Sequence, residues 1–98
     1  MKSRLFRVHH MMGYLFVFAA SNDRAAELFV REWEHRFGDA PGAFSIEELV
    51  RFKYDDEFAS RTKALLITRP EGIAFYSVTM GWLVFSVGAN RDLSPVQL

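Results

Sequence analysis

The alternation of apolar and polar positions predicts a β-hairpin near the start of the chain. Residues 5–9 alternate between apolar and polar side chains, as a strand with one buried face does. Residues 14–19 are apolar throughout, which predicts a strand covered on both faces, by a helix on one and by other material on the other. Residues 11–13, Met-Met-Gly, suit a short turn closed by a left-handed glycine.

A helical period follows this hairpin. Residues 21–23, Ser-Asn-Asp, are typical N-cap residues, and the apolar positions after them recur with the spacing of one helix face. Gly38 stands where a left-handed C-cap is expected. We therefore expect the main helix over residues 24–37. The stripe that its spacing predicts to face inward consists of Ala26, Phe29, Val30, Trp33 and Phe37.

The middle of the chain is compatible with two structures. Residues 45–48, Ser-Ile-Glu-Glu, match a capping box and favour a short helix that ends near residue 52. The apolar residues at 44, 46 and 50 would also suit a strand. Asp55 and Asp56 are placed to cap a further helical turn that ends near residue 62.

The last third predicts a three-stranded antiparallel meander. Its strands are expected at residues 64–68, 73–78 and 82–87, separated by Arg-Pro-Glu-Gly and Thr-Met-Gly turns. We expect a flexible tail over residues 89–98. The 98 residues thus predict one α+β domain. Its antiparallel sheet has about five strands, from the N-terminal hairpin and the C-terminal meander, with the main helix and one or two short helices packed on it.

One short pattern occurs twice, and its meaning stays open. Residues 12–18, Met-Gly-Tyr-Leu-Phe-Val-Phe, align with residues 80–86, Met-Gly-Trp-Leu-Val-Phe-Ser. The pattern is a structural repeat of two hairpins, a pair of turns that present adaptable methionines to a partner, or a coincidence of common turn and strand residues. None of these interpretations implies a chemical reaction.

Composition removes several kinds of site. The chain has no Cys, which excludes disulfides, thiolate metal sites and a cysteine nucleophile, and makes the cytoplasm the simplest compartment. The longest apolar run, residues 11–20, is shorter than the about 20 residues that span a bilayer. We therefore expect no membrane segment, and no cleaved leader.

The net charge is zero, whereas proteins that bind nucleic acid usually carry a basic surplus. Bases outnumber acids over residues 1–24, and acids outnumber bases over residues 25–57. These two regions are able to face each other, a second copy or a partner.

No residue pattern predicts catalysis. The chain has no nucleophile motif and no phosphate-binding glycine loop. The carboxylates at residues 55–57 suit the start of a helix, where acids are favourable. His9 and His10 are neighbours on a strand and point to opposite faces, while His35 is expected on the helix. We therefore expect no enzyme, no metal and no cofactor.

Apolar surface is the remaining signal, because residues 14–19 and 82–87 are apolar on both faces of a sheet with only one long helix. Exposed surface of this kind marks interfaces. We expect a small non-catalytic protein–protein interaction module, either a homodimer or a protein that occupies a partner's surface. Such a module suits a regulatory or inhibitory accessory, such as a modulator of a host system encoded by a phage or mobile element. The residues expected to bind the partner are Met12, Tyr14, Met80 and Trp82 at the turns, and Asp55, Asp56 and Glu57 as an acidic attraction for a basic target.

Two other functions remain as alternatives. A nucleic-acid-binding module would use the outer side of an edge strand through Arg4, Arg7 and His9, with an aromatic side chain available for stacking. A small enzyme or metal-binding protein would use His9, His10 or His35.

Overall fold

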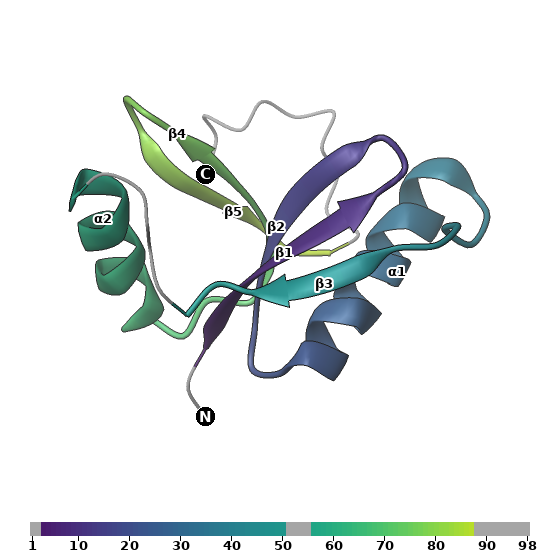
Figure 1. Cartoon of the computed structure of the whole chain (residues 1–98), viewed down its shortest axis with the longest axis horizontal. Coiled ribbons are helices and arrows are strands. Elements are labelled where there is room, and N and C mark those ends of the chain that lie inside the picture. The colour runs from purple at the N-terminus through teal and green to yellow at the C-terminus, as the bar shows by residue number, and fades with distance from the viewer. Residues whose placement is uncertain (1–2, 51–55, 88–98) are drawn as a thin grey trace.

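The structure of the chain, a computed structural model, describes residues 3–50 and 56–87 (Figure 1). It contains β1 (Arg4–His10), β2 (Gly13–Ala19), α1 (Asn22–Phe37), β3 (Ser45–Glu48), α2 (Asp56–Leu66), β4 (Gly72–Ser77) and β5 (Gly81–Phe85). The strands form one open antiparallel sheet in the order β3-β1-β2-β4-β5. The expected α+β fold with a five-stranded antiparallel sheet is therefore confirmed. Among the described residues, no helix combines the length and the apolar character needed to cross a membrane.

The first hairpin forms as the sequence predicts. His10 pairs with Gly13, and only Met11 and Met12 lie in the turn between them. Gly13 has a φ of 136°, a conformation that a residue with a Cβ rarely adopts. The glycine at this position therefore fixes where β1 ends and β2 begins.

Both predicted ends of α1 are confirmed. The side chain of Ser21 accepts a hydrogen bond from the backbone N–H of Arg24, and Gly38 closes the helix with a φ of 80°. The predicted inward stripe is confirmed in part, since Phe29 is buried and Val30 and Trp33 are partly buried against the core. The residues of α1 that are buried are Ala25, Leu28, Phe29 and Glu32. Phe37, predicted to face inward, is exposed, because it lies away from the face of α1 that is buried.

The short helix expected from residue 45 is wrong, because β3 occupies this segment. Local capping chemistry is outweighed by pairing with β1. Ile46 packs against the core beneath α1, and Glu47 lies opposite Arg7 in the β1–β3 register and forms an ion pair with it. The alternative left open for residues 44–50, a strand, is the one observed.

The strand expected at residues 64–68 is also wrong, because α2 continues through Leu66. The C-terminal sheet region is therefore a two-stranded hairpin of β4 and β5 rather than a three-stranded meander. Phe58, Thr62 and Leu65 recur at helical spacing. Phe58 and Leu65 pack into a core cluster with β5, while Thr62 is buried. A short apolar run such as residues 64–66 does not by itself distinguish helix from strand.

The two helices cover different faces of the sheet (Figure 1). In β2, Val17 and Ala19 belong to the cluster beneath α1, whereas Phe18 belongs to a second cluster beneath α2. The prediction that residues 14–19 are covered on both faces is confirmed for residues 15–19, whereas Tyr14 is exposed. The tail expected over residues 89–98 lies outside the described residues.

Candidate functional site

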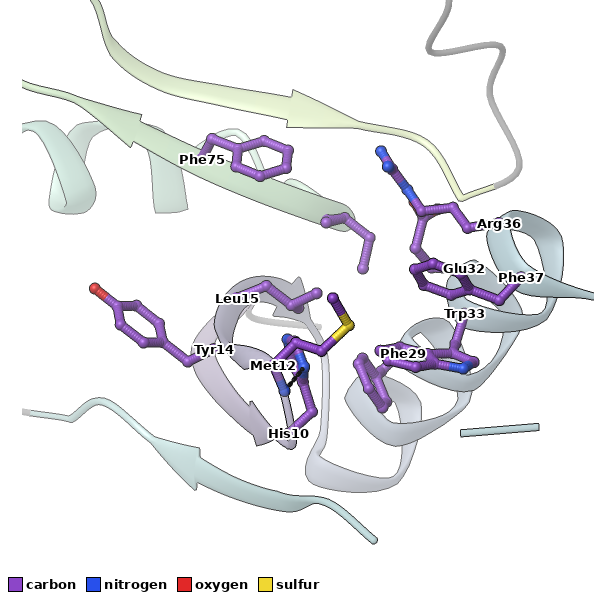
Figure 2. Close-up of a pocket in the computed structure, with 11 residues that line it drawn as sticks. His10, Met12, Tyr14, Leu15, Phe29, Glu32, Trp33, Arg36, Phe37 and Phe75 are labelled. Atoms are coloured by element: carbon purple, nitrogen blue, oxygen red, sulfur yellow. Dashed lines mark hydrogen bonds and ion pairs between the residues drawn. The ribbon is translucent and has the colours of Figure 1, made fainter. Parts of the chain in front are cut away.

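A pocket of about 240 Å³ opens between α1 and the sheet, beside the turn that joins β1 to β2 (Figure 2). Its floor is apolar and its walls are rich in aromatic rings. The residues that line it are His10, Met12, Tyr14, Leu15, Phe29, Glu32, Trp33, Arg36, Phe37, Ile73 and Phe75.

The pocket exists because burial along α1 decreases toward its C-terminus. Ala25, Leu28 and Phe29 lie directly on the sheet, whereas Trp33 is half-buried and Phe37 is exposed. The last turns of α1 therefore form one wall of the pocket. Strand β4 contributes Ile73 and Phe75 to the lining, and Phe75 lies across the cavity from α1 (Figure 2).

Stacked rings fix the α1 wall. His10 stacks on Phe29 with ring centroids 5.7 Å apart and meets Trp33 edge-on at 5.5 Å. Trp33 in turn lies 4.5 Å from the ring of Phe37. The backbone N–H of Met12 donates to Nδ1 of His10 at 3.3 Å, which ties the hairpin turn to this wall. Ring contacts of this kind hold side chains in defined positions, so the pocket is formed before any ligand binds.

One acidic side chain lines this apolar pocket. Glu32 is only 4% exposed, and its Oε2 accepts a hydrogen bond from Nε of Arg36 at 2.7 Å. The guanidinium side chain of Arg36 is itself about half exposed. A carboxylate in an apolar setting is costly unless a cation pairs with it, so Arg36 makes the burial of Glu32 tolerable.

Apolar side chains also surround the opening. Met12 is 72% exposed, Phe37 53% and Phe75 46%. A concave apolar site with a few convergent polar groups is the usual form of a binding site, and exposed apolar residues around it are typical of an interface.

The structure does not gather the predicted partner-binding residues into one site. Met12 and Tyr14 both line the pocket, but the ring of Tyr14 points away from the cavity (Figure 2). Tyr14 instead contacts Phe16 at 5.6 Å between centroids, with the guanidinium carbon of Arg7 5.4 Å from its ring. Trp82 packs in the cluster beneath α2.

Met80 is exposed in the turn before β5. The repeated Met-Gly pattern occupies equivalent places in the two hairpins. Gly13 and Gly81 each open the second strand of a hairpin with a positive φ, 136° and 80°. Both turns project from the same end of the sheet (Figure 1), because β1 and β4 each pair antiparallel with β2.

The acidic run at residues 55–57 is described only in part. Asp55 and the side chain of Asp56 lie outside the described residues. Glu57 is exposed and forms an ion pair with Arg61, one helical turn later, at 2.6 Å. This carboxylate is thus at least partly neutralised within α2.

The basic residues of β1 are paired with acidic residues of β3, and they do not lie on an edge strand as expected. Strand β1 is not an edge strand, because it lies between β3 and β2. Arg7 and His9 both contact Oε1 of Glu47, at 2.9 and 3.2 Å, and Arg4 lies 3.7 Å from Glu48. The hydrogen bond from Arg7, followed by that from His9, lowers the pKa of Glu47. The basic N-terminal region and the acidic middle of the chain thus face each other.

The three histidines lie apart and have different surroundings. His9 contacts Glu47, His10 belongs to the pocket wall, and His35 lines a separate polar hollow where Arg24 pairs with Glu71 at 2.7 Å. Within residues 3–50 and 56–87, no three potential metal ligands lie close enough together to hold an ion.

Sequence reasoning missed most of the pocket. Trp33 and Phe37 were expected in the core, Glu32 was not expected to be buried, and Phe75 was not singled out. One signal was present, since Glu32 follows Leu28 by one helical turn and so lies on the inward face of α1.

Comparisons of the chain with protein families, with curated proteins and with solved structures find no match. A function must therefore be argued from the geometry of the site itself.

Proposed function

We propose that this protein is a non-catalytic interaction module and that a protein partner inserts a side chain into the pocket between α1 and β4. The observation that carries the proposal is a preformed aromatic pocket whose rim residues, Met12, Phe37 and Phe75, are exposed apolar side chains. A central pocket surrounded by water-excluding contacts is the usual arrangement of an interaction hot spot.

The dimensions favour a protein side chain over a free small molecule. The volume of about 240 Å³ is below the roughly 300–1,000 Å³ typical of small-molecule sites. The exposed rim extends the apolar surface beyond the cavity, which suits a ligand that continues as a polypeptide. A module of this kind would suit regulation or inhibition by occupying a partner's surface.

A different protein fits the pocket better than a second copy does. A two-fold interface places the same patch of each subunit against the other. Both pockets would be filled only if an exposed side chain of the same patch reached the pocket of the other copy, whereas a different protein needs to supply one such side chain without this symmetry constraint.

The nucleic-acid alternative has weaker support. Arg7 and His9 are already paired with Glu47, so binding phosphate would require breaking existing ion pairs. In the aromatic pocket, by contrast, Phe37 and Phe75 remain exposed at the rim.

Site-specific photocross-linking in the native host tests the proposal. A photoreactive phenylalanine analogue replaces Phe37 in one variant and Ile67, which is 82% exposed just after α2, in a matched control. We expect one discrete adduct with another protein from position 37 and none from position 67. Equal labelling from both positions, no adduct at all, or an adduct with a second copy of this chain would contradict the proposal.

A further inference from the structure

We infer that the partner presents its anchoring side chain on an extended strand, which pairs with free backbone edges of β2 and β4. This inference rests on the proposed function and adds the conformation and the backbone contacts of the partner's segment. Its basis is an opening in the sheet, called the fork, between residues 13–15 of β2 and residues 75–77 of β4.

The fork arises because β2 and β4 pair over only part of their length. Strand β2 pairs with β1 along all seven of its residues, whereas its pairing with β4 joins residues 16–18 to residues 72–74 alone. Beyond these residues the β1–β2 and β4–β5 hairpins diverge (Figure 1). Both β2 and β4 continue as strands along the fork, so each has an edge there without a strand partner among the described residues.

The free backbone groups of the fork belong to Tyr14 and Tyr76. Successive residues of an antiparallel strand direct their N–H and C=O groups alternately to its two sides. Gly13 closes the two-residue turn with β1 and so faces β1, which leaves Tyr14 facing the fork. Ala74 lies opposite Phe16 in the β2–β4 register, and Tyr76, two residues later, faces the same way. One N–H and one C=O from each tyrosine therefore line the fork.

Backbone groups arranged in this way select an extended polypeptide. A strand edge with unpaired N–H and C=O groups is a template for pairing with another chain, and addition of a strand to an exposed edge is a common mode of peptide recognition. The edge strand β3 is less suited, because it has four residues and exposes Glu47 and Glu48, and charged side chains protect an edge from pairing. The other edge strand, β5, contributes no residue to the pocket.

The pocket lies on one face of the fork. The β2–β4 register, continued by one residue beyond Phe16 and Ala74, places Leu15 level with Phe75, and both of these side chains line the pocket. Side chains at the same level of neighbouring strands point to the same face of a sheet. A residue of an added strand at this level would therefore direct its side chain into the pocket.

Aromatic rings lie on the other face of the fork. The ring of Tyr14 is 5.6 Å from that of Phe16, which is 5.1 Å from the ring of Trp82. Tyr76 lies at the other end of this row, 5.1 Å from Trp82. The neighbours of the anchoring residue, which alternate to this face, would pack on these rings. The partner's segment should therefore be apolar at the pocket and rich in β-branched residues around it.

Residues 88–98 of this chain are the other candidate for the fork. They continue from Val87, which packs against the core cluster beneath α1, and so they begin near the pocket. Their sequence, Gly-Ala-Asn-Arg-Asp-Leu-Ser-Pro-Val-Gln-Leu, contains few strand-forming residues and a proline that lacks a backbone N–H. A separate polypeptide with alternating apolar residues therefore fits the fork better.

Nuclear magnetic resonance and hydrogen exchange of the full chain provide the test. The probe is a capped heptapeptide with threonine at odd positions, valine at the second and sixth positions and leucine at the centre. One control peptide carries methyl groups on its three central amide nitrogens, which removes these donors and keeps every side chain. A second control peptide is methylated only on the amide nitrogen of its last residue.

We expect the backbone amides of Tyr14 and Tyr76 to exchange rapidly in the free chain. The heptapeptide should slow the exchange of both amides and shift the indole N–H signal of Trp33, which lines the pocket. Methylation of the central amides should raise the dissociation constant at least about tenfold, whereas methylation of the last residue should leave it unchanged.

Three results would overturn the inference. Equal binding of the centrally methylated peptide would show that the backbone is not recognised. Slow exchange of both tyrosine amides in the free chain would show that the fork is already occupied, by residues 88–98 or a second copy. Protection confined to β3 or β5, or no change on adding the heptapeptide, would contradict the placement in the fork. The cross-link at position 37 judges the proposed function separately.

A variant of the chain tests where the strand lies. Phe75→Asp places a carboxylate between the fork and the pocket, and it should raise the dissociation constant of the heptapeptide at least about tenfold. The matched control, Val78→Asp, changes an exposed residue in the turn after β4 and should leave the dissociation constant unchanged. Native affinity in a folded Phe75→Asp variant would overturn the placement. If Phe75→Asp does not fold, the methylated peptides still decide.

Discussion

Replacing Thr62 by Val should weaken the attachment of α2 to the sheet. Thr62 is fully buried, and its Oγ1 donates to the carbonyl of Phe58 at 2.7 Å and accepts from Nε1 of Trp82 at 2.9 Å. The indole ring of Trp82 packs edge-on against Phe16 and Phe18 of β2. This hydrogen bond therefore connects a helix to a ring that packs against the second core cluster.

The expected cost comes from the indole N–H rather than from a cavity. Valine has nearly the shape of threonine, so packing is retained. The carbonyl of Phe58 keeps the backbone partner that an α-helix provides. The part-buried indole donor loses its acceptor, which costs about 2 kcal/mol. In a domain of 98 residues, this loss should lower the Tm by roughly 10 °C.

Urea unfolding followed by far-ultraviolet circular dichroism measures this loss. The matched control is Thr68→Val, since the exposed hydroxyl of Thr68 also donates to a carbonyl, that of Leu65; its effect should stay within about 0.5 kcal/mol. Adding Thr62→Val to Trp82→Phe should cost far less than in the native background, because the donor is already gone. A single-variant loss below about 0.5 kcal/mol, or full additivity of the pair, would refute this reasoning.

Two further outcomes follow from the backbone and the ion pairs. Gly72→Ala should lower the free energy of unfolding in urea by about 3 kcal/mol. A Cβ at this position would lie 2.1 Å from the carbonyl oxygen of Phe85, and the backbone φ is 147°. Gly42→Ala, which has open space around it, should be neutral, and equal effects of the two variants would contradict this reasoning. Hydrogen bonding by Arg7 lowers the pKa of Glu47, so its stabilisation is present above the ordinary glutamate pKa and is lost as pH falls through the lowered one. The Glu47→Gln variant should therefore have a lower free energy of unfolding than the native chain at neutral pH, and this difference should disappear in acid. A difference that does not change with pH would argue against stabilisation by the Arg7–Glu47 pair.

Elements whose ends are set by local chemistry were predictable from the sequence. Ser21 and Gly38 mark the ends of α1, since a cap side chain and a left-handed glycine satisfy backbone groups that a helix leaves open. The apolar positions on both sides of β2 correctly predicted two covered faces, because alternation along a strand assigns each side chain to a face.

The elements set by distant partners were not predictable in the same way. Residues 45–48 carry a helix-start pattern, yet Ile46 and Glu47 are fixed by the core and by Arg7 of β1. The apolar run of residues 64–66 is compatible with a helix or a strand, and the helical spacing of apolar residues that begins at Phe58 decides for the helix. In residues 45–48 the deciding interaction joins residues that are far apart in the chain, whereas residues 64–66 follow the helical period of α2 itself.

The pocket depends on tertiary geometry and was largely hidden from sequence reasoning. Trp33 and Phe37 carry the pattern of core residues, and only the position of α1 on the sheet shows that they form a wall. Met12 was singled out as an adaptable turn residue and does lie at the pocket. Its role in binding a partner stays a prediction.

The measurement that tests the central claim most directly is the affinity of the partner identified by cross-linking at position 37. Isothermal titration calorimetry would compare the native chain with Phe37→Asp and with the control Ile67→Asp, both at exposed positions. The account predicts that Phe37→Asp raises the dissociation constant at least about tenfold and that Ile67→Asp leaves it unchanged. Native affinity in a correctly folded Phe37→Asp variant would contradict the assignment of the pocket as the binding site.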